Sequence, residues 1–152
     1  MIQIISNPYY LNIGIIIFCA IIFINNKNYQ NGEKLFVIIA TLSWVLLSGF
    51  RHVSIGSDTL KYYYKFNQTI FTNWDTLFRN FMNIIFFGSE DGKDPGYYLF
   101  LKVITLFTQN YQVFLVIIAL IFTVPLGIWV YKNSRNPFIS FLIYSTLFYY
   151  HI

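Results

Sequence analysis

The residues best suited to chemistry lie in one short stretch, residues 50–66, between two apolar parts of the chain. A helix that begins near Ser57 places four polar side chains of this stretch on one face, because their spacing is i, i+3, i+4 and i+7: Asp58, Lys61, Tyr62 and Lys65. Two ammonium groups would keep the carboxylate ionised, and they could also receive a phosphate. The alternative is that Asp58 or Ser57 caps the helix after a turn at Gly56, while the lysines extend toward lipid headgroups.

Two further candidates precede this face, at the end of the second apolar segment. Arg51 can bind a diphosphate in a bidentate manner, and His52 can exchange protons near neutral pH. We therefore interpret Arg51 and His52, together with Asp58, as catalytic candidates. The alternative for Arg51 is an interfacial anchor, which is common for an arginine at a helix end.

An acidic cluster follows later in the chain, with Glu90, Asp91 and Asp94 around Lys93. Its spacing lacks the ligand series of a calcium loop, so we predict no metal site. The chain also lacks a glycine-rich phosphate loop, a zinc spacing and a nucleophile elbow, and we predict no cofactor. Its 10 Lys and Arg residues are spread over the whole length, which predicts no nucleic-acid partner.

The composition is typical of a membrane protein. Hydrophobic residues make up 57% of the chain and charged residues 11%, whereas a soluble domain has about 25% charged residues. The apolar residues form blocks separated by short polar loops, as in multi-pass proteins. We predict an all-α, polytopic integral membrane protein, a single transmembrane domain in the lipid bilayer with about four spans. These are about residues 9–24, 35–50, 111–131 and 138–152.

Residues 51–110 are predicted to form one long outward loop with helices of its own. An amphipathic helix of about 14 residues, lying on the membrane surface, is indicated by apolar residues at helical spacing: Trp74, Leu77, Phe78, Phe81 and Ile85. Asp94, Pro95 and Gly96 indicate the start of another helix. Residues 97–107 are too short to span a bilayer and are predicted to be re-entrant or interfacial, the alternative being a short fifth span.

The orientation follows from the basic residues of the short loops. Lys27 and Lys34 mark the first loop and Lys132 and Arg135 the third, which places both inside and residues 51–110 outside. The fourth apolar run reaches Ile152 without a polar flank or a helix stop signal. We therefore expect the chain to be an N-terminal fragment of a larger polytopic protein.

Several of these residues, in this spacing, resemble the EpsG family of Wzy-like bacterial membrane proteins, which act in exopolysaccharide and capsule assembly. The similarity covers residues 50–150 and rests on an RxxxxGxD motif, a following Tyr and a later acidic-Pro-Gly-Tyr element: Arg51, Gly56, Asp58, Tyr62, Phe66, Asp94, Gly96, Tyr97, Asn136, Pro137 and Phe138. Family members often carry Glu where this chain has Asp94, and such a fragment would correspond to the N-terminal part of a family member.

The resemblance implies a glycosyltransferase-type polymerase that joins undecaprenyl-diphosphate-linked oligosaccharide repeat units at the outer face of the bacterial cytoplasmic membrane. By this resemblance Arg51 grips the diphosphate, Asp58 activates or orients an acceptor hydroxyl, and Tyr62 and Tyr97 line a sugar groove. The remaining predicted substrate-binding residues are Lys61, Lys65 and Asp94.

Two other classes of protein stay open: a transporter or flippase of the same lipid-linked sugars, and a non-catalytic membrane partner of other polysaccharide assembly proteins. A transporter predicts charged residues inside the spans, and residues 9–24, 35–50 and 111–131 contain none. As the expected N-terminal fragment, the chain would lack the second half of a family member, and whether it is active by itself stays open.

Overall fold

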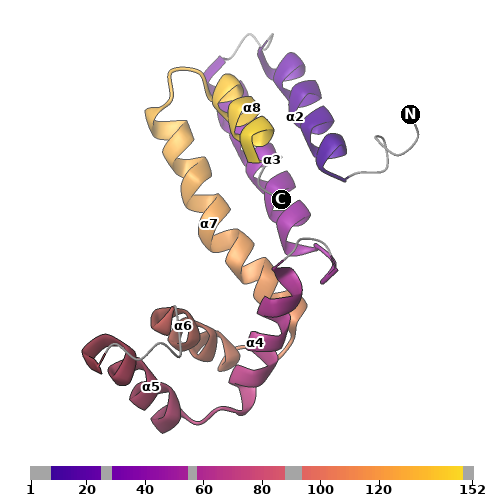
Figure 1. Cartoon of the computed structure of the whole chain (residues 1–152). Coiled ribbons are helices and arrows are strands. Elements are labelled where there is room, and N and C mark those ends of the chain that lie inside the picture. Colours follow the sequence, from indigo (N-terminus) through magenta and orange to yellow (C-terminus); the bar gives the residue numbers. More distant parts are fainter. Residues whose placement is uncertain (1–7, 25–28, 55–57, 88–93, 149–152) are drawn as a thin grey trace. The chain divides into compact units, whose positions relative to one another are not determined.

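The computed structural model describes residues 8–24, 29–54, 58–87 and 94–148. Within these residues the chain forms seven helices and no strand, which confirms the all-α prediction (Figure 1). The chain divides into two compact units. Unit 1 consists of residues 1–51 and 115–152, and unit 2 of residues 52–114.

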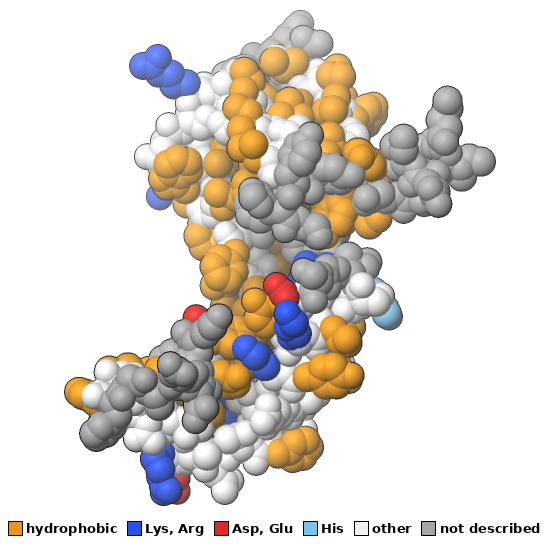
Figure 2. All heavy atoms as spheres, viewed as in Figure 1, with side chains coloured by type: hydrophobic (Ala, Val, Ile, Leu, Met, Phe, Trp, Pro, Cys, Tyr) orange, Lys and Arg blue, Asp and Glu red, His pale blue; other side chains and the backbone are white. Residues whose placement is uncertain are grey.

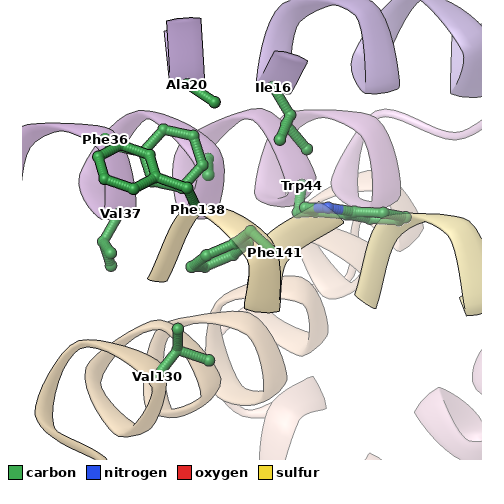
Figure 3. Packing of buried hydrophobic residues seen from close by; sticks show 9 residues of the cluster. Ile16, Ala20, Phe36, Val37, Trp44, Val130, Phe138 and Phe141 are labelled. Carbon is green, nitrogen blue, oxygen red and sulfur yellow. The ribbon is translucent and has the colours of Figure 1, made fainter. Parts of the chain in front are cut away.

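Unit 1 contains α2 (Pro8–Ile24), α3 (Tyr29–Gly49), most of α7 (Tyr111–Asn133) and α8 (Pro137–Phe148). Each helix contributes a narrow buried stripe, such as Phe36, Ala40 and Trp44 of α3, spaced by four residues. A buried cluster joins these stripes and contains residues from all four helices (Figure 3): Ile16, Ala20, Phe36, Val37, Ala40, Trp44, Val130, Phe138 and Phe141. Much of the remaining surface of these helices is also apolar, and hydrophobic side chains cover much of the face shown in Figure 2. Helices that are apolar on all sides suit a lipid environment.

One polar contact lies inside this cluster. The indole Nε1 of Trp44 donates a hydrogen bond to the hydroxyl of Ser145 over 3.1 Å, and this hydroxyl donates to the carbonyl of Phe141 over 2.7 Å. Both hydrogen bonds are buried, so the tryptophan ties α3 to α8 without leaving its N–H unsatisfied.

Small residues bring α3 and α7 into direct contact within unit 1. A Cβ at Gly127 would collide with the Thr41 side chain, and one at Gly49 would lie 3.0 Å from the Val116 Cγ2. The contacts run in opposite directions along the two helices, so α3 and α7 are antiparallel. Such close approach through glycine is a common mode of helix packing in membranes.

Two helices are long and apolar enough to cross a membrane, namely residues Asn31–Gly49 of α3 and the whole of α7. They correspond to two of the predicted spans. Pro8–Ile24 and Pro137–Leu147 are apolar but shorter, and residues 149–152 of the fourth predicted span lie outside the described residues. The count of four spans stays a prediction.

Unit 2 contains α4 (Thr59–Phe71), α5 (Trp74–Phe87), α6 (Pro95–Thr105) and the start of α7. Helix α6 packs against both α4 and α5. The fully buried residues Phe66 of α4 and Leu101 of α6 are at the centre of this unit. The ring of Phe66 also packs at a tilt against that of Phe114, with ring centroids 4.8 Å apart. Helix α5 has the predicted start and length, and α6 begins where the Asp-Pro-Gly signal indicated.

Candidate functional site

An ion pair lies at the start of α4. The Lys61 Nζ is 3.0 Å from the Asp58 Oδ1, and the two side chains are 75% and 57% exposed. Asp58 occupies the N-cap position, but its side chain makes no capping hydrogen bond. Its carboxylate instead accepts a hydrogen bond from Lys61, and this bond raises the pKa of the lysine. The sequence is compatible with Asp58 as a side-chain cap or as a carboxylate paired with the lysines of its helix face. The structure contains the ion pair with Lys61 and no side-chain cap.

The start of α6 supplies tyrosines to the same face of α4. The rings of Tyr62 and Tyr97 meet edge to face with centroids 5.6 Å apart. The Lys65 Nζ lies 5.8 Å from the ring centroid of Tyr97 and 5.4 Å from that of Tyr98. These are cation–π distances. The structure therefore brings together five of the eight predicted site residues, which we call the α4–α6 face: Asp58, Lys61, Tyr62, Lys65 and Tyr97.

The two lysines of this face differ in their surroundings. Lys61 is paired with a carboxylate, whereas no carboxylate among the described residues lies within ion-pair distance of Lys65. Lys65 is half-buried, and its ammonium group lies over the rings of Tyr97 and Tyr98. A positive charge held in this way keeps its attraction for an anion better than a fully hydrated one.

Tyr97 is a half-buried phenol at the centre of the face. Burial raises its pKa above the ordinary value, and the neighbouring phenol of Tyr62 adds to the effect. The side chain is therefore neutral at physiological pH and can donate a hydrogen bond while its ring packs against another ring or a sugar.

Asp94 occupies the N-cap position of α6 without a side-chain cap. Its backbone carbonyl accepts a hydrogen bond from the Tyr97 N–H over 3.1 Å, which begins the helix, and its carboxylate is exposed. No ion pair joins this carboxylate to α4 among the described residues. Glu90, Asp91 and Lys93 of the acidic cluster lie outside the described residues. Within them, no group of three or more His, Cys, Asp or Glu side chains could hold a metal ion.

The two remaining candidates are not part of the α4–α6 face. His52 is exposed, and its Nδ1 lies 2.7 Å from the Ser54 hydroxyl and accepts a hydrogen bond from the Ser54 N–H over 3.2 Å. Its neutral ring therefore carries its proton on Nε2. Arg51 belongs to unit 1 and is half-buried. Its Nε is buried and has no hydrogen-bond partner in the described part of the chain.

Two residues of unit 2 were missed by the sequence analysis. Tyr98 supplies the nearer of the two rings to Lys65; its residue type suits a sugar groove, as that of Tyr97 does, but it is not among the predicted site residues. Lys102 is buried, with only 9% of the residue exposed. In the sequence it is a single basic residue in an apolar run, and no local pattern indicates its partners, which lie 32 and 33 residues away.

A buried aromatic layer supports α4 behind the exposed face. The Tyr63 and Tyr111 rings meet edge to face with centroids 5.0 Å apart, and the Tyr111 hydroxyl donates a hydrogen bond to the Thr59 carbonyl over 3.2 Å. Because this contact fixes the first turn of α4, it also fixes the turn that carries Asp58 and Lys61.

Comparison with known proteins gives one match. A family model described as the EpsG family matches residues 34–152, which is most of the chain and includes every residue of the α4–α6 face. No curated protein and no solved structure matches the chain.

Proposed function

The chain belongs to the EpsG family, and from this premise we propose that it takes part in joining glycan repeat units carried on undecaprenyl diphosphate. Its family identifies it as a membrane protein related to polysaccharide biosynthesis, and two of its helices are long and apolar enough to cross a membrane.

The proposed reaction is a glycosyl transfer. A hydroxyl of the acceptor glycan attacks the anomeric carbon of the donor, the bond from that carbon to the diphosphate oxygen breaks, and the diphosphate leaves with the electron pair. The hydroxyl proton must go to a base. The protein therefore needs a carboxylate near the acceptor and positive charge near the departing diphosphate.

The observation that carries the proposal is the contrast between the two lysines of the α4–α6 face. Lys65 lies against the Tyr97 and Tyr98 rings, and no described carboxylate pairs with it, so we assign it as the cation that receives a phosphate. Lys61 is occupied by Asp58 and holds that carboxylate at the start of α4. We assign Asp58 to the acceptor hydroxyl, Lys65 to the diphosphate, and the rings of Tyr62 and Tyr97 to the sugar.

Arg51 is the second proposed diphosphate ligand. A buried donor without a partner costs about 1–3 kcal/mol, and the Arg51 Nε is such a donor among the described residues. A diphosphate oxygen would satisfy it, and the guanidinium plane suits bidentate contact with phosphate. His52 and Asp94 keep the predicted roles of proton exchange and substrate contact.

The test is the length distribution of the glycan made by variants in their native membrane. We expect Asp58→Asn and Arg51→Ala each to lower polymer formation by about 100-fold or more, as losses of catalytic groups do. Both proteins should still insert at the wild-type level. Asp75→Asn is the matched control, because Asp75 is also an exposed carboxylate in the first turn of a helix of unit 2.

Wild-type chain lengths in Asp58→Asn or Arg51→Ala would refute the assignment of that residue. The location of the face is tested separately with single cysteines at Ser89 and Asn133 in a Cys19→Ser background. An impermeant thiol reagent should label Ser89→Cys in intact cells and leave Asn133→Cys unlabelled. Equal labelling of the two would contradict the outward placement of unit 2.

A further inference from the structure

Lys102 is a buried lysine that bonds only to backbone carbonyls in the described part of the chain. Its Nζ donates hydrogen bonds to the carbonyls of Thr69 and Ile70, each over 3.1 Å, and the side chain is 9% exposed. Both carbonyls belong to the last turn of α4, which ends at Phe71. Carbonyls in the last turn lack an i+4 N–H partner within their own helix, and they form the negative end of the helix dipole. The Thr69 carbonyl also accepts a hydrogen bond from the Thr72 N–H over 3.3 Å, so Lys102 is its second partner.

This contact explains how an ammonium group is accommodated in the centre of unit 2. A buried cation is strongly unfavourable unless it is compensated, and none of the described carboxylates lies within ion-pair distance of Lys102. The two carbonyls and the dipole of α4 provide the compensation. Because both acceptors belong to the end of one helix, Lys102 has this compensation at only one position along α4.

The same contact sets the alignment of α6 with α4. Lys65 meets Tyr98, and one helical turn further along both helices, Thr69 meets Lys102. The spacing is four residues on each helix, so the two contacts follow α4 and α6 in the same direction along the chain. The Tyr62–Tyr97 contact lies three residues earlier on α4 and one residue earlier on α6 than the Lys65–Tyr98 contact, in the same order along both helices.

We infer that Lys102 is a positioning residue: its hydrogen bonds to the end of α4 hold α6 in the register that places Tyr97 and Tyr98 against Lys65 and Tyr62. Two of its three N–H donors bond to backbone carbonyls inside the unit. In this respect Lys102 differs from Lys61 and Lys65 of the α4–α6 face. A shift of α6 by one residue would rotate the tyrosines away from Lys65, because successive residues on a helix differ by about 100°. The effect on the reaction rests on the proposed function, whereas the effect on the register does not.

The register is tested by a thiol cross-link that needs no activity. In a Cys19→Ser background, Tyr62→Cys and Tyr97→Cys place two thiols on the helices whose rings now meet. A short bifunctional thiol reagent should join them efficiently in native membranes. We expect Lys102→Met, which keeps the length and loses the donors, to lower the yield several-fold, and Lys102→Arg to restore most of it. Val103→Met is the control, since Val103 is 45% exposed on the same helix.

The second readout is the kinetics of polymer formation with Tyr62 and Tyr97 intact. Lys102→Met should raise the KM for the lipid-linked donor by about 10- to 100-fold, the range expected when a binding group is misplaced, and Lys102→Arg should bring it back toward wild type. If Lys102→Met does not accumulate, the cross-linking yields of Lys102→Arg and Lys102→Gln decide: Arg must exceed Gln. Equal yields in those two variants, or an unchanged yield and KM in Lys102→Met, would overturn the inference. An unchanged polymer in Asp58→Asn together with a lost cross-link in Lys102→Met would refute the proposed function alone.

Discussion

Two pairs of helices in this protein begin in different ways. At α7 and α8 an asparagine caps the helix: the Asn110 Oδ1 accepts a hydrogen bond from the Gln112 N–H over 2.8 Å, and the Asn136 Oδ1 accepts one from the Ile139 N–H over 3.2 Å. At α4 and α6 the N-cap residues are Asp58 and Asp94, and neither side chain makes a capping hydrogen bond. Aspartate caps helices about as well as asparagine does. The carboxylates of Asp58 and Asp94 therefore do not serve to begin their helices, and that of Asp58 pairs with Lys61 instead.

This difference divides the residues by which the chain resembles its family into two groups. Asn136, Pro137 and Phe138 have structural roles in unit 1: a side-chain cap, a proline in the first turn of α8 and a ring in the buried cluster. Asp58, Tyr62 and Tyr97 are partly or fully exposed in unit 2, and burial explains none of them. A shared motif thus contains residues that build the fold and residues that can act on a ligand, and only the contacts separate them.

The largest expected effect tests whether unit 1 is a tightly packed scaffold. We expect Gly127→Leu to destabilise the protein by about 3 kcal/mol or more, at or above the upper end of the usual cost of overpacking. The reason is that even a Cβ at Gly127 would collide with Thr41 of α3. The measurement is the amount of protein in the membrane and its thermal midpoint in detergent.

Gly14→Leu is the matched control, because Gly14 is also a helix glycine of unit 1 and a Cβ there would meet nothing within 4 Å. If Gly127→Leu accumulates and melts like Gly14→Leu, the direct contact of α3 with α7 is wrong.

The next effect is smaller and addresses the caps themselves. Asn136→Ala should lower the free energy of unfolding by about 1 kcal/mol, the usual cost of losing an N-cap side chain. Asp58→Ala should change it much less, because the side chain caps nothing and its ion pair with Lys61 is exposed. Thermal midpoints of the two variants give the comparison, and glycan length gives the reverse order of sensitivity. Equal losses of stability would mean that Asp58 is a structural cap after all.

The helices themselves were largely predictable from the sequence, because hydrophobic periodicity and start signals are local. Helix α5 begins at Trp74 as its pattern predicted, and α7 begins at Tyr111. Helix α4 begins at Thr59, after Asp58, while Gly56 and Ser57 lie outside the described residues. The i, i+3 pairing of Asp58 with Lys61 also follows from helix geometry alone.

Contacts between helices were not predictable in this way. The partners of Lys102 lie 32 and 33 residues away along the chain, and the hydrogen bond from Trp44 to Ser145 spans 101 residues. Their residue types carry no signal of the pairing: a lysine in an apolar run resembles an interfacial residue, and a serine in an apolar helix resembles a chance polar position. The packing of the helices decides which helices face each other. It is this packing that places Lys102 against the end of α4, behind the proposed site.

The smallest effect distinguishes two groups at the start of α6, the exposed carboxylate of Asp94 and the half-buried phenol of Tyr97. Burial raises the pKa of Tyr97 in the folded protein, whereas an unfolded tyrosine ionises near pH 10. Above about pH 10 the unfolded chain releases this proton and the folded chain keeps it, so stability falls as pH rises. The contribution of this phenol to stability is fully present below that pH, and Tyr97→Phe removes the pH dependence.

We therefore expect the thermal midpoint of the wild type to fall relative to that of Tyr97→Phe between pH 9 and pH 11, by an amount that solvent exposure of the ring keeps small. Tyr64→Phe, at a ring that is 64% exposed, is the control. A constant difference between the wild type and Tyr97→Phe over this range would show that the phenol is as well hydrated as the carboxylate three residues before it, and that the α4–α6 face is more open than its contacts indicate.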